Sequence, residues 1–178
     1  MNEPTTSPTA VDVLVEAFSR IPDLVHDVMD GIEGEVLLWR PEVDGRTNNS
    51  IGWTVWHIGR MEDAQIADLA GSAEVHDSQG WGERLGVPYP ASTHGYGMGP
   101  ADVARFEVAS PELLTAYYDA VHARSVEVLR SLNADALAEV VDERWDPPVT
   151  ALVRLVSIVD DAAQHAGQAA YLKGLLSH

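Results

Sequence analysis

The spacing of apolar residues in four long segments constrains the fold more than any other feature of this sequence. The segments are 10–31, 51–70, 111–132 and 149–176. In each, apolar side chains recur every three, four or seven positions, which is the period of an amphipathic helix. No convincing alternation of apolar and polar residues indicates a strand. The sequence therefore predicts an all-α fold, a four-helix bundle with one long crossover between the second and third helices.

Proline, glycine and serine residues mark the expected ends of these helices. Pro22 removes a backbone donor inside the first segment, so we expect the first helix to kink or split there. Ser50 and Ser110 stand where a hydroxyl can accept a backbone N–H bond and cap the second and third helices. Gly71 is expected to end the second helix.

The second helix, 51–70, is expected to bury one stripe and expose the other. Its inward stripe comprises Val55, Ile58, Met61 and Leu69. The charged residues expected mostly toward solvent are Arg60, Glu62, Asp63 and Asp68. His57 lies in the apolar run SIGWTVWHIGRM, and its core-like neighbours predict that the imidazole faces inward.

Residues 72–109 connect the second and third helices. They are rich in glycine and proline, which predicts an irregular crossover with at most a short helix near 101–107. Loops of this length are uncommon unless they cover a site or form a partner surface. We therefore expect the crossover to pack over one end of the bundle as a lid.

Length and charge limit the classes of protein to which the chain can belong. Its 178 residues predict a single domain spanning 1–178, of which the Pro/Thr/Ser-rich residues 1–9 form a flexible lead. The 28 acidic and 11 basic residues give a formal charge of −17, which disfavours binding to nucleic acid or to anionic membranes. No apolar run approaches the roughly 20 residues that span a bilayer, and no secretory signal is evident. We expect a cytoplasmic protein.

The absence of cysteine excludes disulfides, thiolate metal sites and cysteine nucleophiles. A metal must then be held by His, Asp, Glu or water. Asp161 and His165 are one helical turn apart and share a face of the last helix, and His57 is the candidate third ligand from the second helix. The simpler alternative is a hydrogen-bonded core histidine at 57 and an ordinary side-chain pair at 161 and 165.

The other histidines and the tryptophans have weaker functional signals. His26 and His122 lie on expected helices without a useful partner, so surface or packing roles are expected, and His178 is terminal. His76 and His94 lie in the crossover, where His94 could contact a substrate. The tryptophans, expected as core and loop anchors because each buries a large area, are Trp39, Trp53, Trp56, Trp81 and Trp145. No G-x-S-x-G or phosphate-binding glycine motif is present.

Two segments resemble proteins of the DinB-like superfamily. SIGWTVWHIGRMEDAQIADLAG is similar to their second helix, and DDAAQHAGQAAYLKGLL to their last helix, where His or Glu precedes a histidine by four positions and a G-Q or G-H pair follows. The order of helices and the long crossover also agree. The resemblance implies a divalent metal, zinc or nickel, on His57, Asp161 and His165. It further implies thiol transfer, as in mycothiol-dependent maleylpyruvate isomerase and bacillithiol S-transferases, and a homodimer.

This resemblance leaves two hypotheses open. The first is a metal-dependent S-transferase or isomerase that activates a small thiol for attack on an electrophile. Mycothiol is the first thiol to test, because Lys173 is the one lysine among eleven basic residues, a bias that suggests a GC-rich genome. The second is a non-catalytic, metal-free small-molecule-binding or stress-associated bundle. The metal-free alternative stays open because relatives have His or Glu at the position of Asp161. The side chain of Asp161 is one methylene shorter than that of Glu, so its oxygen reaches less far toward an ion. Asp160 points about 100° away around the helix and is a poorer substitute.

Overall fold

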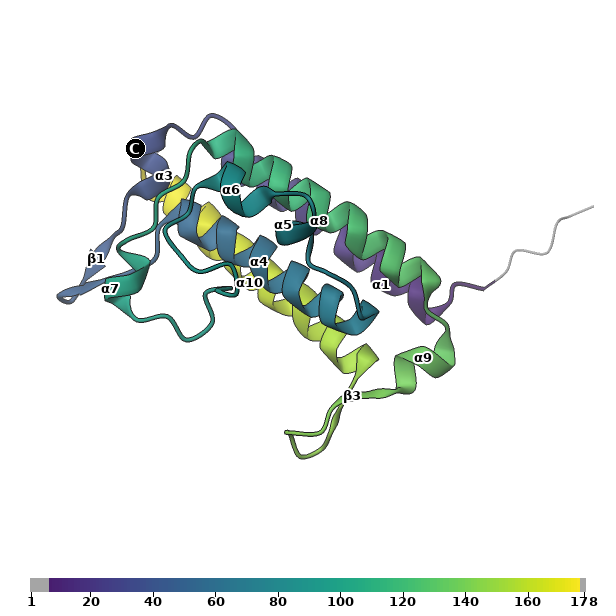
Figure 1. Cartoon of the computed structure of the whole chain (residues 1–178). Coiled ribbons are helices and arrows are strands. Elements are labelled where there is room, and N and C mark those ends of the chain that lie inside the picture. The colour runs from purple at the N-terminus through teal and green to yellow at the C-terminus, as the bar shows by residue number, and fades with distance from the viewer. Residues whose placement is uncertain (1–6, 177–178) are drawn as a thin grey trace, which may run out of the picture.

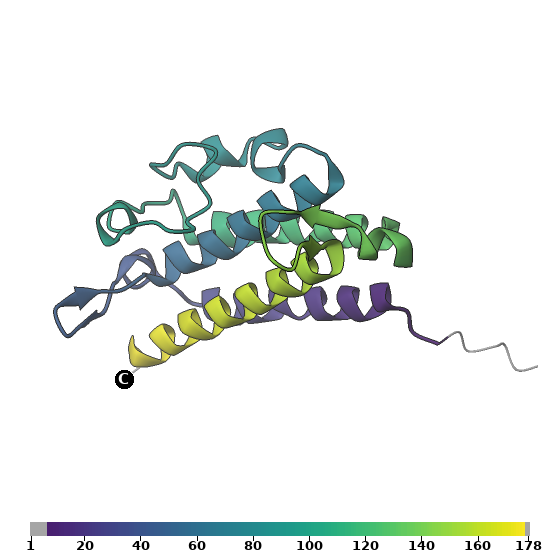
Figure 2. The same cartoon turned by 90° about the horizontal axis from the view of Figure 1, so that it is seen from below.

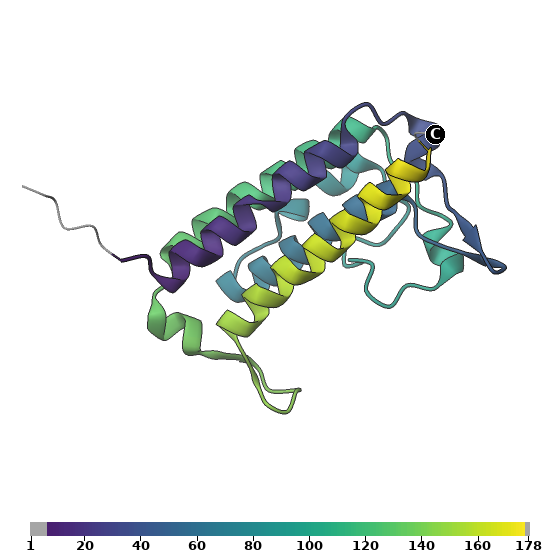
Figure 3. The ribbon, with the colours of Figure 1, turned by 180° about the vertical axis from the view of Figure 1, so that it is seen from behind.

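The computed structural model describes residues 7–176, which form a bundle of four helical arms (Figure 1). The arms are α1 (Ala10–Ser19) with α2 (Ile21–Met29), α4 (Ile51–Ala70), α8 (Pro111–Ser131) and α10 (Ala151–Leu176). The α4 arm packs between α8 and α10, and the α1–α2 arm packs against α8 and α10 on the opposite side (Figure 3). The predicted all-α four-helix bundle is confirmed.

The first arm is split, as the proline predicts. Arg20 separates α1 from α2, and Pro22 lies in the first turn of α2, where the missing N–H needs no intrahelical partner. Thr9 caps α1 through a reciprocal capping box with Asp12. Residues 1–6 of the predicted flexible lead lie outside the described residues, as does His178.

The ends of the other arms follow the predicted signals with one exception. Ser50 Oγ accepts the backbone N–H of Trp53 at 3.2 Å and caps α4, and Gly71 ends α4 in the left-handed conformation at φ +60°. Ser110 occupies the N-cap position of α8 but makes no side-chain capping bond there, so that part of the prediction is wrong.

Short elements connect the arms, and the sequence predicted only one of them. They are α3 (Gly34–Leu38), α5 (Val75–Ser78), α6 (Trp81–Leu85), α7 (Pro100–Val103) and α9 (Ala134–Ala138), with β1 (Glu42–Val43), β2 (Arg46–Thr47), β3 (Val140–Asp142) and β4 (Val149–Thr150). The strands form two antiparallel hairpins, β1–β2 and β3–β4. Elements of two to five residues are too short to show a helical or strand period, so the hairpins and the helices α3, α5, α6 and α9 went unpredicted. The short helix expected near 101–107 corresponds to α7, but the expectation of at most one short helix in the crossover is wrong, because α5 and α6 are also present.

The crossover covers a flank of the bundle instead of an end. Its α5 packs against α4 and α8, and α6 packs against α8. Figure 2 shows the crossover running along the side that α4 and α8 form. Whether it limits access to a site stays a prediction.

Burial on α4 differs most from the sequence prediction. Val55 and Ile58 are buried as expected, but Arg60 and Glu62 are each only 1% exposed, and Asp63 is also buried. The physical reason is that α8, α10 and the crossover together surround α4, so the face assigned to solvent is covered. Among the described residues, no helix is both long and apolar enough to cross a membrane.

Candidate metal site

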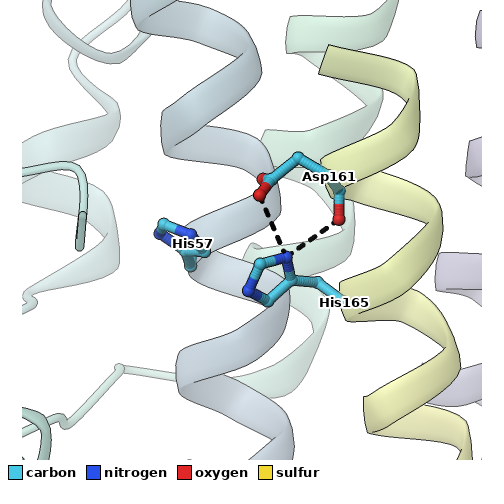
Figure 4. Close-up of side chains that lie close together, drawn as sticks. All are labelled: His57, Asp161 and His165. Carbon is cyan, nitrogen blue, oxygen red and sulfur yellow. Dashed lines mark hydrogen bonds and ion pairs between the residues drawn. The ribbon is translucent and has the colours of Figure 1, made fainter. Parts of the chain in front are cut away.

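His57, Asp161 and His165 meet between α4 and α10. One ligand atom from each residue lies within 4.8 Å of the other two. The two imidazole centroids are 4.7 Å apart, with ring planes at 67°. Figure 4 shows the three side chains facing one another across the two helices. The structure therefore brings together the three residues that the sequence singled out.

Hydrogen bonds to backbone carbonyls orient both imidazoles. Nδ1 of His57 donates to the carbonyl oxygen of His94 at 2.6 Å, and Nδ1 of His165 donates to the carbonyl oxygen of Asp161 at 2.8 Å. A carbonyl oxygen only accepts, so in each ring Nδ1 carries a hydrogen, and in the neutral form of the ring Nε2 keeps its lone pair. This is the tautomer that a histidine presents to a metal when its other nitrogen is held by a carbonyl.

His57 is held firmly and is kept neutral. Its ring stacks on Trp53, with centroids 4.9 Å apart and planes at 12°, and Gly95 packs against its Nδ1 edge. Desolvation by burial lowers the pKa of His57 below its ordinary value, although the bond to the His94 carbonyl opposes this shift. The neutral ring, which is the form that binds a metal, is therefore favoured at neutral pH.

The donor set fits zinc or nickel. Imidazole nitrogens and a carboxylate suit both metals, and a tetrahedral ion about 2.1 Å from each ligand would hold neighbouring ligand atoms about 3.4 Å apart. One ligand atom from each of the three residues lies within 4.8 Å of the other two, an upper limit that includes this spacing. The oxygen of Asp161 belongs to this group, so the shorter side chain does not exclude it.

An open cleft of about 990 Å³ lies beside the three residues, between α4, α10, the crossover and the β3–β4 hairpin. Asp161 and the side chain of His94 line it, and so do the aromatic rings of Tyr96 and Trp145. Its charged side chains are Asp68, Asp142, Asp160, Asp161, Arg144 and Arg154. The carboxylates outnumber the guanidinium groups, so the cleft has a net negative charge before any ion binds.

Ion pairs hold the β3–β4 hairpin at the mouth of the cleft. Arg154 on α10 pairs with Asp68 on α4 and lies 3.6 Å from Asp142 on β3. Hydrogen bonds from Arg144 to Asp142 lower the pKa of that carboxyl far below its ordinary range. The loop between these strands presents Trp145, which is 63% exposed. The expectation that Trp145 anchors a loop is therefore wrong, whereas the buried Trp53, Trp56 and Trp81 are core anchors.

The other described histidines lie outside the three-residue cluster. His26 forms an exposed hydrogen bond with Asp119 at 2.7 Å, His76 is buried against Tyr117, and His122 packs on Tyr118. Surface and packing roles are thus what the structure shows for them. The sequence suggested the side chain of His94 as a contact, but it had no signal for the backbone carbonyl, which binds His57.

Comparisons with known proteins show the family and the fold. A family model of the DinB superfamily matches residues 17–169. The chain belongs to the DinB superfamily. A crystal structure of a conserved protein from Enterococcus faecalis is similar, with a TM-score of 0.85 and 30% sequence identity over 94% of this chain and 96% of that one. No curated protein matches the sequence. The family that the two helical motifs predicted is therefore confirmed.

Proposed function

We propose that this DinB-superfamily chain is a metal-dependent thiol S-transferase or isomerase. His57, Asp161 and His165 would hold the divalent ion, zinc or nickel. One observation carries the proposal: two imidazoles, each with its Nδ1 bound to a carbonyl, and a carboxylate converge beside an open cleft. Metal binding is common in the superfamily, which adds support.

The ligand residues would set the charge of the site. A bound divalent ion supplies Lewis-acid chemistry that lowers the pKa of a neighbouring thiol. Neutral His57 and His165 contribute no charge, and Asp161 contributes one negative charge. The three ligands together therefore compensate only half of the charge of a divalent cation. Three protein ligands also leave a fourth position open, as in catalytic zinc sites. This arrangement favours binding of a thiolate over a neutral thiol.

The cleft would hold the substrates. Its volume of about 990 Å³ is at the upper end of the range for small-molecule sites, so a thiol and a small electrophile fit together. His94, Tyr96 and Trp145 line it and would contact them. Mycothiol is the first thiol to test, because only one of the eleven basic residues is a lysine, a bias that suggests a GC-rich genome.

Elemental analysis of protein purified without chelators or a histidine tag tests the metal site. We expect near-stoichiometric zinc or nickel, loss of the metal in His165→Ala, and retention in Asp161→Glu, whose side chain has a longer reach. His26→Ala is the matched control, because His26 pairs with Asp119 on the surface, and it should retain the metal. Unchanged metal content in His165→Ala would show that the ligands are wrongly assigned.

Thiol transfer is tested separately with the metal-loaded protein. Mycothiol, bacillithiol and glutathione are each offered with 1-chloro-2,4-dinitrobenzene, and formation of the thioether is followed by absorbance. We expect one thiol to react faster than without protein, and His57→Ala to abolish that acceleration. Stoichiometric metal with no acceleration for any thiol and several electrophiles would leave the metal site standing and remove the transferase proposal.

The second candidate function is a metal-free small-molecule-binding or stress-associated bundle. One observation favours it: Oδ1 of Asp161 lies 3.5 Å from Nδ1 of His165, so these two side chains form an ion pair without a metal when His165 is protonated. The elemental analysis separates the two candidates, because this function predicts protein without stoichiometric metal that still binds ligands in the cleft.

A further inference from the structure

Arg60 is a buried arginine one helical turn after His57 on α4. Its side chain is 1% exposed. Nε donates to the carbonyl oxygen of Thr93 at 3.1 Å, and Nη2 donates to the carbonyl oxygen of Ala91 at 2.8 Å. A planar guanidinium can make both bonds at once because its donors point in fixed, diverging directions. Arg60 therefore binds the crossover at two carbonyls two residues apart.

Carboxylates compensate the charge of Arg60. Nη1 donates to Glu74 Oε2 at 2.6 Å and lies 3.5 Å from Asp63 Oδ2. Asp63 in turn accepts the backbone N–H groups of Val75 and His76, each at 2.7 Å. A buried charge is tolerated when it is paired and hydrogen-bonded in this way. The network thus holds two parts of the crossover, 74–76 and 91–93, against α4.

The segment that Arg60 holds continues directly into the contact with His57. His94 follows Thr93, and its carbonyl oxygen accepts Nδ1–H of His57 at 2.6 Å. The next residue, Gly95, has φ +94°, and a Cβ there would lie 2.5 Å from His57 Nδ1 and 3.1 Å from Trp53 Cζ2. Only glycine allows the backbone this close to the imidazole, so the position of the segment determines the position of the ring.

We propose that Arg60 is a positioning residue for the metal site: by binding the carbonyls of Ala91 and Thr93, it places the carbonyl of His94 to fix the orientation and tautomer of His57. With Nδ1 bound to this carbonyl, Nε2 is the nitrogen of His57 that can offer a lone pair to the site shared with Asp161 and His165. The consequence for metal affinity rests on the function proposed above, whereas the tautomer of His57 does not require an ion.

Arg60→Lys is the informative variant, because it keeps the positive charge beside Glu74 and Asp63. A single ammonium cannot reproduce the fork that binds two carbonyls, so residues 91–95 lose their anchor. Tyr117→Phe is the matched control. Tyr117 donates to Asp63 at 2.8 Å and accepts from Arg60 Nη1 at 3.3 Å, so its removal disturbs the same buried network but leaves both carbonyl bonds in place.

The first readout is the tautomer of His57 in metal-free protein, from long-range ¹H–¹⁵N correlation spectra. We expect the Nδ1–H tautomer alone in the wild type and in Tyr117→Phe, and a mixture with the Nε2–H tautomer in Arg60→Lys. Gly95→Ala displaces the carbonyl of His94 without changing Arg60, so it should also give a mixture of the two tautomers. It replaces Arg60→Lys in the test if that variant does not fold. A pure Nδ1–H tautomer in the variants that fold, or an equal mixture in Tyr117→Phe, overturns the proposal.

The second readout is affinity for Co²⁺, followed by its visible absorption. Loss of a group that orients a ligating histidine typically weakens metal binding about 10- to 100-fold, and we expect a loss of that size in Arg60→Lys with little change in Tyr117→Phe. Equal losses in the two variants would show a general effect of destabilisation and overturn the proposal. A further outcome is that neither the wild type nor any variant binds Co²⁺, while the tautomer of His57 still shifts in Arg60→Lys as expected. In that case the metal function fails, and the positioning of His57 by Arg60 stands.

Discussion

Replacing Glu62 by Gln should stabilise the protein at pH 8 and change its stability much less at pH 4.5. Glu62 lies between α4 and α8, 1% exposed. Its Oε2 accepts from Tyr118 Oη at 3.0 Å, and its Oε1 lies 2.6 Å from Ser125 Oγ. Desolvation by burial raises the pKa of this carboxyl from 4.5 to about 7, although both hydroxyl bonds act in the opposite direction.

The hydrogen bonds show why a neutral side chain suits this position. Ser125 Oγ has one hydrogen and two acceptors within reach, Glu62 Oε1 and the Val121 carbonyl oxygen at 3.1 Å. When Glu62 is protonated, it can donate to Ser125 Oγ while Ser125 donates to Val121. The amide of glutamine can make the same two contacts, accepting from Tyr118 and donating to Ser125.

The size of the effect follows from proton linkage. Between pH 4.5 and about 7 the folded protein keeps the proton on Glu62, whereas the unfolded chain releases it. The stabilising contribution is therefore complete below pH 4.5 and is lost as the pH rises through 7. Each pKa unit corresponds to about 1.4 kcal/mol, so Glu62 should lower the free energy of unfolding by about 3 kcal/mol across this range.

Urea unfolding of metal-free wild type and Glu62→Gln, at intervals from pH 4.5 to 8.5 with a chelator present, measures this contribution. The stability difference between the two proteins should grow by about 3 kcal/mol in favour of the variant over this range. Glu107→Gln is the control, because Glu107 is exposed, and its difference from wild type should stay nearly constant. A difference between wild type and Glu62→Gln that does not change with pH would refute the reasoning.

Three further predictions concern packing, the crossover and assembly. Gly59→Ala should destabilise the protein by about 1–3 kcal/mol in thermal unfolding, because the new Cβ would lie 2.9 Å from the Tyr117 ring. Gly167→Ala on α10, with nothing within 4 Å of the added methyl, should instead stabilise it by up to about 1 kcal/mol. Asp63→Ala frees two backbone N–H groups of the crossover and should speed limited proteolysis within 72–109; if cutting there leaves metal binding unchanged, the crossover is not a lid. The homodimer that the family resemblance implies is expected in light scattering after size exclusion, and a monomeric mass would contradict it.

Local chemistry in the sequence was sufficient to predict the arms of the bundle. Helix α4 begins and ends where Ser50 and Gly71 predict, and Pro22 splits the first arm as expected. Caps, prolines and a helical period act over a few residues, so their signals are readable without tertiary contacts. The pairing of Asp161 with His165 is likewise a property of one helical turn, and only the third candidate ligand, His57, required an assumption about another helix.

Tertiary structure alone decided what surrounds these residues. Arg60 and Glu62 were expected toward solvent from the period of α4, yet both are buried, because the period locates the most apolar face and not the number of neighbours that cover the helix. The partner of His57 is a backbone carbonyl of His94, and every residue carries such a group, so the sequence contains no signal for it. Contacts between segments far apart in the chain depend on how the crossover packs, and that packing follows from the whole core instead of from any local pattern.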